Sequence, residues 1–533
     1  KKMKIKFFGF LVFLSLAFTY LNAQQPYNLI FNHSYQHIER DLYNSDSRFH
    51  TAIKPYLKNQ TDTISNYDDV LQIETTKKIW DIVFNKSLIK KKYKHFEFSI
   101  DPAINLELGF DNDYDQKSWV NTRGIFIRAG IGDNFAMGTQ FLENQAMFND
   151  LRNDRIKQLT QRVIPGQGLS KIFKQKPNGY DYYFSDAYIS YSPSKYFNFQ
   201  LGTGKNFFGD GYRSLLLSDN SFNYPHFKIT TDIWQIKYVN LWAQFQHLRD
   251  SRPDVAMNTK KWGAFQYLSW NVTQWLNLSL FEAVIWRDQD SIRGHRGFDI
   301  HYANPVIYLR PVEWCVGSPD NIIVGAAGKI TLLKKTALYG QLVFDEFKIS
   351  ELRKRDGWHG NKWGIQAGLK SYDLFSVERL DFQTELNVVR PFMYSHDPVT
   401  NYTHFNQPLA HPLGSNFAEA VTFLRYGYKR LFFDVQLIFA KHGADTANLN
   451  YGNNLFLPYS TYAQNYGNKF FQADEVNLKI LNATVSFLIN PAYNLNVYTG
   501  IIVRNETSST INRQQKLIVF GIRTSLHNFY WDF

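Results

Sequence analysis

The chain of 533 residues contains a single cysteine, Cys315, and only five methionines. One cysteine cannot form an intrachain disulfide, and it excludes a zinc site built from several cysteines. Glycine and proline are present in ordinary amounts, 31 and 17 residues, which excludes collagen-like and low-complexity chains. Hydrophobic residues make up 44% of the chain, so a wholly disordered protein is excluded as well.

Long apolar runs are also missing, apart from one at the start. Four lysines within residues 1–6 precede an apolar run over residues 7–18, and Ala23 follows it. A charged segment, a short apolar segment and a small residue are typical of a cleaved export signal. The run is too short for a comfortable membrane span. We therefore predict a signal peptide over residues 1–23; the alternative is an uncleaved membrane anchor.

The formal net charge of +12 would suit a nucleic-acid-binding protein only if the cations were clustered. Four of them belong to the predicted signal peptide, and the one further basic run is Lys90-Lys91-Lys92. An exported protein with so little clustering is not expected to bind nucleic acid.

Apolar and polar residues alternate with a period of two along most of the chain. Phe96, Phe98 and Ile100 alternate with Glu97 and Ser99. We expect strands near 96–110, 122–131, 134–143, 182–191, 196–204, 227–234, 236–248, 261–272, 275–286, 321–333, 336–347, 360–371, 376–390, 418–429, 431–441, 475–489, 493–504 and 515–526. One apolar face and one polar face would suit either a soluble sandwich or a membrane barrel.

The connections between these strands separate the two alternatives. Short turns such as Gly132-Asp133 alternate with long segments such as 144–181, and 505–514 is also taken as long. Short periplasmic turns and long outer loops are the pattern of outer-membrane barrels. We predict an all-β fold, a transmembrane antiparallel barrel of about 18 strands over residues 96–533, in the cell outer membrane. Trp531-Asp532-Phe533 would suit recognition by the barrel-assembly machinery.

Residues 24–95 alternate poorly and would precede the barrel. Val70–Leu88 and Phe49–Leu57 could each form a short helix. This part is predicted to be a partly helical periplasmic extension or a plug inside the barrel.

The composition agrees with a barrel in contact with lipid. Aromatic residues reach 17% while mean hydropathy is only −0.36. Only every second residue of a barrel strand meets lipid, and tyrosine and tryptophan concentrate at the two membrane interfaces.

Motifs of common enzymes are missing from the sequence. It contains no G-x-S-x-G, no H-E-x-x-H and no complete phosphate-binding loop. A lipid hydrolase using His247 or His396 is a distant third hypothesis, because no serine is placed beside either histidine. We predict no enzymatic activity, no cofactor and no metal.

Aromatic and amide-rich loops give a better functional signal. Residues 205–226 and 442–474 combine rings with Asn, Asp and Arg. Aromatic faces stack on sugar C–H surfaces, and amides satisfy sugar hydroxyls. The alternative is that these rings pack the loops into a lid or belong to the interfacial girdle.

Several blocks resemble a known family. The run Gly204–Asn220 (GKNFFGDGYRSLLLSDN) is similar to the signature of RemB-type gliding-motility proteins, which are related to the Wzi-type capsule-assembly family. The run His404–Asn416 (HFNQPLAHPLGSN) and shorter blocks around Asn304-Pro305 and Val389-Arg390-Pro391 are similar too. The resemblance spans roughly residues 77–533.

The resemblance implies an eighteen-stranded barrel that is occluded by loops and that holds surface polysaccharide or serves gliding. Candidate ligand-binding residues are Phe207, Phe208, Asp210, Tyr212, Arg213, Asp219, Asn220, His396, His404, Asn406, His411, Tyr459 and Tyr462. Expected partners are outer-membrane lipid and, beyond it, surface polysaccharide or gliding-machinery proteins. The competing hypothesis is a diffusion channel or transporter whose polar inner face conducts solute.

Overall fold

A computed structural model describes residues 25–30, 35–65, 71–112, 117–159, 162–174, 176, 178–248, 258–290, 294–308, 320–346, 348–446 and 449–533. The predicted signal peptide, residues 1–23, lies outside the described residues. Within the described part, no helix has the length and apolar character needed to cross a membrane.

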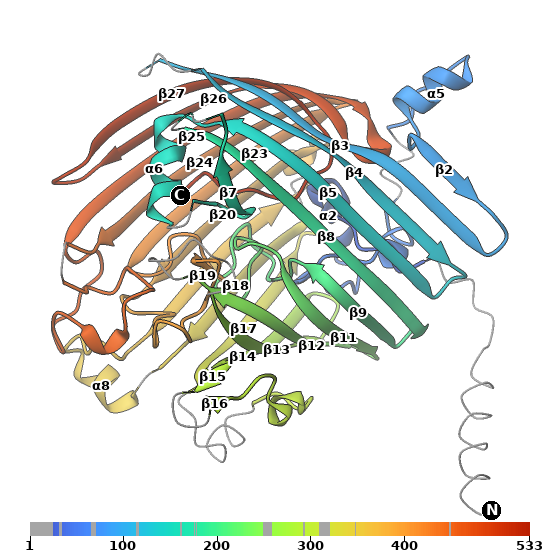
Figure 1. Cartoon of the computed structure of the whole chain (residues 1–533). Helices are drawn as coiled ribbons and strands as arrows, with labels where there is room; N and C mark the ends of the chain where they lie inside the picture. Colours follow the sequence, from blue (N-terminus) through green and yellow to red (C-terminus); the bar gives the residue numbers. More distant parts are fainter. Residues whose placement is uncertain are drawn as a thin grey trace, which may run out of the picture.

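Eighteen long antiparallel strands of the described part form a closed barrel wall (Figure 1). They are β3 (Phe96–Asp111), β4 (Ser118–Ile131), β5 (Phe135–Met147), β8 (Gly179–Ser194), β9 (Phe197–Gly204), β11 (Tyr224–Ile233), β12 (Ile236–His247), β13 (Thr259–Asn271), β14 (Leu276–Arg287), β17 (Asn321–Leu332), β18 (Thr336–Phe344), β19 (Trp363–Ser371), β20 (Leu380–Val389), β23 (Phe417–Tyr428), β24 (Leu431–Ala444), β25 (Asp474–Asn490), β26 (Leu495–Thr507) and β27 (Asn512–Arg523). Each predicted strand overlaps one of them, so the fold prediction is confirmed.

Alternation explains the two faces of the wall. On β3, Leu106, Leu108 and Phe110 are exposed on the outer face, whereas Glu107 between them points into the lumen. Because neighbouring side chains on a strand point to opposite faces, a strand can present apolar groups to lipid and polar groups to the interior.

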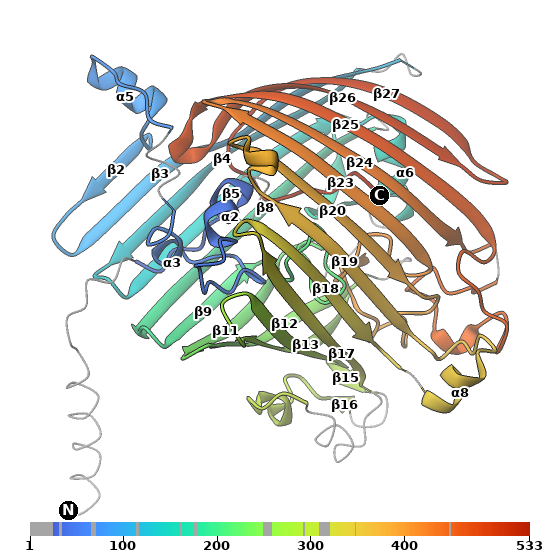
Figure 2. The ribbon, with the colours of Figure 1, turned by 180° about the vertical axis from the view of Figure 1, so that it is seen from behind.

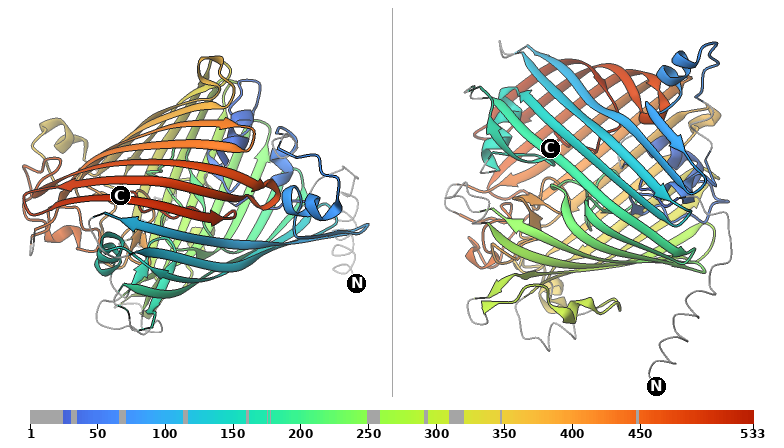
Figure 3. Two further views of the ribbon diagram at one scale, coloured as in Figure 1. Left: turned by 90° about the horizontal axis from the view of Figure 1, so that it is seen from above. Right: turned by 45° about the vertical axis from the view of Figure 1, so that its right-hand side comes forward.

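Short turns lie at one end of the barrel and long connections at the other (Figure 3). We call these the short-turn end and the long-loop end. The predicted long connection 505–514 is wrong, because β26 and β27 extend and leave only residues 508–511 between them. Their cross-strand pairing continues to Thr507 and Asn512. Residues 505–507 and 512–514, which were assigned to the loop, therefore belong to the two strands.

The N-terminal part fills the short-turn end of the lumen (Figure 2). It contains α2 (Tyr35–Leu42), β1 (Ile53–Lys54) and α3 (Lys58–Thr61). Side chains from this part bond to inward-facing wall residues, as Lys370 Nζ donates to Glu39 Oε2 at 2.8 Å. We call residues 35–65 the plug. The helix expected over Phe49–Leu57 is wrong, because that stretch contains β1, which pairs with β10 (Phe207–Phe208).

Two further N-terminal elements, α5 (Lys78–Phe84) and β2 (Ile89–Lys92), lie at the rim of the short-turn end. The helix α5 falls within the stretch 70–88 for which a helix was expected. The guanidinium of Arg430 donates to the carbonyl of Phe84, the last residue of α5, at 2.9 Å and so holds the end of this helix.

The long connections carry the remaining short elements. They are α6 (Asp150–Gln158), β6 (Val163–Ile164), β7 (Gly168–Ile172), β15 (Gln289–Asp290), β16 (Gly294–His295), η2 (Ile300–Ala303), α8 (Ile349–Lys354), β21 (Thr403–His404), β22 (Gln407–Pro408) and η4 (Tyr459–Thr461), with η3 (Leu374–Ser376) and η5 (Pro491–Tyr493) in two short turns.

One long connection lies against the outside of the wall. We call residues 294–308 the wall strap. Gln266 is outward-facing yet only 3% exposed, and its Nε2 donates to the carbonyl of Asn304 at 2.9 Å. Trp242 Nε1 donates to the carbonyl of Tyr302 at 2.8 Å. The strap thus covers a polar patch that would otherwise face lipid.

The barrel closes where β27 pairs with β3. This seam runs from Leu517–Asp111 to Arg523–Asn105. The rest of β3 extends beyond the end of β27 and pairs there with β2. After Arg523 the chain turns inward, so residues 524–533, the tail, lie inside the lumen beside the loops described next.

Candidate functional site

Two long connections fold into the lumen and close it. We call residues 205–223 and 390–416 together the lid. Leu215, Leu216 and Leu217 are fully buried. The hydroxyls of Tyr394 and Tyr402, from the second connection, donate to the carbonyls of Leu215 and Leu216 at 2.7 and 2.6 Å. The lid is therefore packed, and its apolar core continues into inward-facing wall residues such as Val239 and Phe281.

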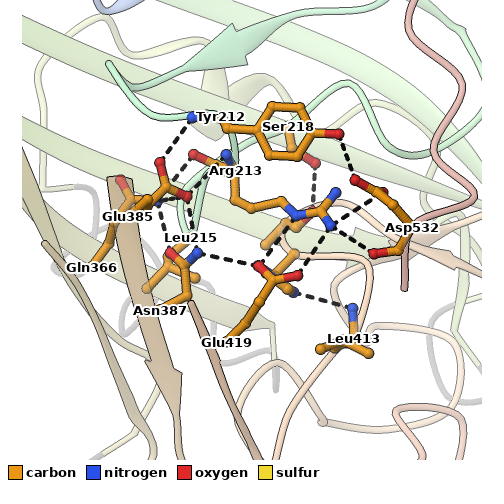
Figure 4. A network of polar contacts seen from close by, with 12 residues as sticks. Tyr212, Arg213, Leu215, Ser218, Gln366, Glu385, Asn387, Leu413, Glu419 and Asp532 are labelled. Carbon is orange, nitrogen blue, oxygen red and sulfur yellow. Dashed lines mark hydrogen bonds and ion pairs between the residues drawn. The ribbon is translucent and has the colours of Figure 1, made fainter. Parts of the chain in front are cut away.

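Arg213 joins the lid to the wall and the tail (Figure 4). Its guanidinium lies 3.0 Å from Glu419 on β23 and 3.2 Å from Asp532 in the tail. Burial opposes the charge, but these two carboxylates raise the pKa of Arg213 well above its ordinary value. A buried ion pair of this kind is costly to break, because the partner that remains keeps an uncompensated charge.

A second carboxylate fixes the backbone beside Arg213. Glu385, on β20, accepts from the backbone N–H groups of Tyr212 and Arg213 at 2.8 and 3.1 Å. The aromatic ring of Tyr212 packs against Phe423 and Tyr530. The predicted candidates Tyr212 and Arg213 therefore hold the lid in place.

His411 completes this network from the other half of the lid. Its Nε2 lies 2.6 Å from Glu419, and its Nδ1 accepts from the backbone N–H of Leu413 at 3.1 Å. This arrangement assigns the proton to Nε2. The ring is fully buried and stacks on Phe417.

The lid also contacts the plug. Asp210 accepts from the hydroxyls of Tyr43 and Thr51, both in the plug. Phe207 and Phe208 are buried. These contacts connect the lid with the plug, which fills the short-turn end of the occluded lumen.

Asp219 connects the lid with the tail. It accepts from the hydroxyl of Tyr530 at 2.8 Å and from Asn528 at 3.2 Å. Burial raises the pKa of Asp219. Further along the tail, the ring of Phe533 lies 4.8 Å from the guanidinium of Arg155. Phe533 thus lies inside the lumen and not on a wall strand, and its recognition by the assembly machinery stays a prediction.

Three more candidates form hydrogen bonds within the lid or to the wall. His404 Nδ1 accepts from the backbone N–H of Gln246 at 3.0 Å, and burial lowers the pKa of His404 to about 3. Asn406 bonds to both backbone groups of Leu248. Asn220 donates to the carbonyl of Pro408 at 3.0 Å.

The remaining candidates, His396, Tyr459 and Tyr462, lie together at the long-loop end and are only half-buried. The ring of Tyr462 stacks on His359 at 4.0 Å, and His396 lies 5.5 Å from Tyr459. We call these four residues the outer aromatic cluster. His359 was not predicted, and its position beside Trp358 was the only signal in the sequence.

A lumen cavity of about 430 Å³ remains beside the lid. It runs along the inward face of β26, and the tail forms one of its sides. Its lining includes Tyr212 from the lid, Glu107 from β3 and four arginines (Arg152, Arg425, Arg504 and Arg523).

The thirteen predicted residues therefore divide into two groups. Eleven belong to the lid: nine of these are buried, Tyr212 is partly buried, and His396 is half-buried at the outer surface, as are Tyr459 and Tyr462 of the other loop. Burial leaves the first nine no surface for an external glycan in this conformation. Among the described residues, no group of three or more His, Cys, Asp or Glu side chains could hold a metal ion.

A closed antiparallel barrel with an apolar outer face and a polar, occluded lumen is an outer-membrane β-barrel protein. No protein-family model and no curated protein sequence matches the chain.

Among solved structures, the chain is similar to Wzi of Escherichia coli, an outer-membrane protein involved in group 1 capsule assembly and a carbohydrate-binding β-barrel. The TM-score is 0.54 at 12% identity, covering 94% of this chain and 100% of Wzi. OprD of Pseudomonas aeruginosa gives a TM-score of 0.41 at 10% identity, covering 80% of this chain and 94% of that one. OccAB2 of Acinetobacter baumannii gives a TM-score of 0.43 at 12% identity, covering 80% of this chain and 97% of OccAB2. The likeness to Wzi is one of fold.

Proposed function

We propose that this protein is a closed outer-membrane barrel that binds surface exopolysaccharide at its long-loop end and serves in organising the cell surface, including gliding. The observation that carries the proposal is the occluded lumen: ion pairs join the lid to the wall and to the tail and the plug to the wall, and hydrogen bonds to Asp210 join the plug to the lid. A pore closed in this way suits a binding protein better than a channel. The carbohydrate binding named for Wzi, which shares the fold, adds support.

The outer aromatic cluster is the binding surface we propose. Tyr459 and Tyr462 present ring faces that are half-buried and therefore held in position. Lys362, whose Nζ lies 4.3 Å from the Tyr459 ring centroid, gives the cluster a nearby cation. Held rings with polar neighbours suit sugar binding, because little conformational freedom is lost when the sugar stacks.

The test is binding of purified protein to exopolysaccharide isolated from the same cells. We expect the double substitution Tyr459→Ala with Tyr462→Ala to weaken binding about tenfold, while the barrel keeps its heat-modifiable band on SDS gels. Tyr196→Ala is the matched control, since Tyr196 is an exposed tyrosine at the short-turn end. Unchanged binding in the double variant would count against the proposed surface.

The alternative function is a diffusion channel, and the lumen cavity along β26 is the observation that favours it. Planar-bilayer recordings separate the two. A steady conductance of the unmodified protein would support the channel, whereas a silent barrel supports the closed binding protein.

A further inference from the structure

The lumen cavity contains a guanidinium whose donors are only partly used. Arg504, on β26, is 7% exposed. Its Nη2 donates to Glu506 and to the carbonyl of Phe533, both at 3.1 Å. Its Nε and Nη1 have no hydrogen-bond partner among the described residues. Buried donors without acceptors cost free energy, so this position is suited to a ligand that brings an acceptor.

The charges around the cavity favour an anion. Arg152 lies 3.3 Å from Glu107, and Arg425 lies 3.7 Å from Asp434. Arg523 lies over the Tyr498 ring at 4.4 Å and forms no ion pair with any described carboxylate. Arg504 pairs with Glu506, and Asp532, which also lines the cavity, pairs with Arg213 of the lid, so Arg523 is the lining arginine that has no acidic partner among the described residues.

The rest of the lining suits a carbohydrate. Amide side chains line the cavity from several wall strands, with Gln436 on β24, Asn482 on β25 and Gln515 on β27. The rings of Tyr498 and Phe432 lie among them. Amides can satisfy sugar hydroxyls, and aromatic faces can stack on sugar rings.

The shape indicates an extended ligand. Asn496, Tyr498 and Arg504 follow one another on the inward face of β26, and all three line the cavity. At about 3.4 Å per residue, the path from Asn496 to Arg504 covers about 27 Å. A linear chain of sugars fits such a path better than a compact solute does.

We propose that the lumen cavity binds an acidic oligosaccharide, which lies along β26 with one carboxylate oxygen on Nη1 of Arg504. A guanidinium N–H donates a charge-assisted hydrogen bond to a carboxylate oxygen. The proposal rests on the proposed glycan-binding function, because it names the chemical class of the glycan. It uses none of the residues of the outer aromatic cluster.

Calorimetric titration of the full-length protein in detergent tests the site, with trigalacturonate as the acidic probe and maltotriose as the neutral one. We expect trigalacturonate to bind and maltotriose to bind at least tenfold more weakly. Arg504→Gln should weaken trigalacturonate binding about tenfold or more, and Arg504→Lys should weaken it less, because the charge stays although the Nη1 donor is lost. Arg353→Gln, at an exposed arginine of α8, should change nothing.

A second variant covers the case in which Arg504→Gln does not fold. Thr484→Trp places a large ring in the cavity from β25 and leaves Arg504 intact; it should abolish trigalacturonate binding. Full binding in a folded Thr484→Trp or Arg504→Gln variant would overturn the proposal. So would equal binding of maltotriose, or displacement of trigalacturonate by an equal concentration of inorganic phosphate.

Failure of the lumen site and failure of the proposed function give different experimental results. Trigalacturonate binding that depends on Arg504 would stand even if Tyr459→Ala with Tyr462→Ala left exopolysaccharide binding unchanged. Conversely, loss of exopolysaccharide binding in that double variant, with no trigalacturonate binding at all, would support the outer surface and overturn the lumen site.

Discussion

The first half of the lid, residues 205–223, and the loop that carries Tyr459 and Tyr462 have similar compositions but opposite positions. Both are rich in aromatic rings and amides, yet residues 205–223 lie inside the lumen and residues 449–473 remain at the long-loop end. The difference lies in the wall that each loop meets. Gln341, Glu385 and Glu419, on the inward faces of β18, β20 and β23, offer acceptors to the lid. Loop composition alone therefore does not tell a lid from a binding surface.

The largest effect is expected from Arg213→Ala. The change leaves Glu419 buried without its cation, so we expect the lid to lose about 3–5 kcal/mol of stabilisation. Lid opening should appear as a steady conductance in planar bilayers that is larger than that of the unmodified protein. Arg353→Ala serves as the control.

A second substitution sharpens this test. Adding Glu419→Gln to Arg213→Ala removes the uncompensated charge and should restore part of the closure. Equal conductance in the single and double variants would show that the ion pair does not hold the lid.

A smaller effect is expected at the plug, from Glu39→Gln. Burial alone would raise the pKa of Glu39, but Lys370 and Lys54 hold it below its ordinary value. The stabilisation is therefore complete above the unfolded pKa of about 4.3 and is lost as pH falls through the lower folded value. Glu39→Gln should cost the plug about 2–3 kcal/mol at neutral pH.

Limited proteolysis of residues 35–65 as a function of pH checks both expectations. In the unmodified protein, cleavage should increase only below about pH 4. In Glu39→Gln, cleavage at neutral pH should already be higher and its dependence on acid weaker. A plug that stays equally protected in both proteins would contradict this account.

The wall strap should respond more weakly than lid or plug. Trp242→Phe removes one hydrogen bond, to the carbonyl of Tyr302, at a cost of about 1 kcal/mol. Hydrogen exchange of residues 294–308 should speed up about fivefold while exchange in the lid stays constant. Tyr183→Phe, at an outward tyrosine, is the control; faster exchange there as well would point to a general loss of stability.

The smallest effect on the barrel is expected from Tyr462→Ala. The ring is half-buried at the surface and packs mainly on His359, so stability should change by no more than about 1 kcal/mol. The thermal midpoint of the heat-modifiable band measures this. A large drop would show that the outer aromatic cluster holds the barrel together as the lid does.

Much of the wall was predictable because lipid on one side and polar groups on the other impose a strict period of two. The strand expected at 475–489 is β25, Asp474–Asn490. The strand expected at 122–131 begins earlier, at Ser118, because Trp119 and Asn121 continue the pairing with β3. Strand ends depend on pairing partners, which alternation does not specify.

The lid and plug were less predictable, since their conformation depends on partners far away in the chain. The helix α2 was missed although Tyr35, Glu39 and Leu42 recur on one helical face and are buried. Short helices are stabilised mainly by the surface they pack against, and here that surface is the lumen. For the same reason, the sequence did not indicate whether the aromatic residues of the run 204–220 lie inside the lumen or at the outer surface.

The seam between β27 and β3 sets the order in which the wall forms. Each other wall strand pairs with its neighbours in the chain, whereas the contact of Thr524 with Ile104 joins residues 420 positions apart. Bringing such distant segments together costs chain entropy that no local contact offsets beforehand. We therefore expect closure of this seam to be the slowest step of folding, so that substitutions at Leu517 or Phe520 slow barrel formation more than equal changes between adjacent strands.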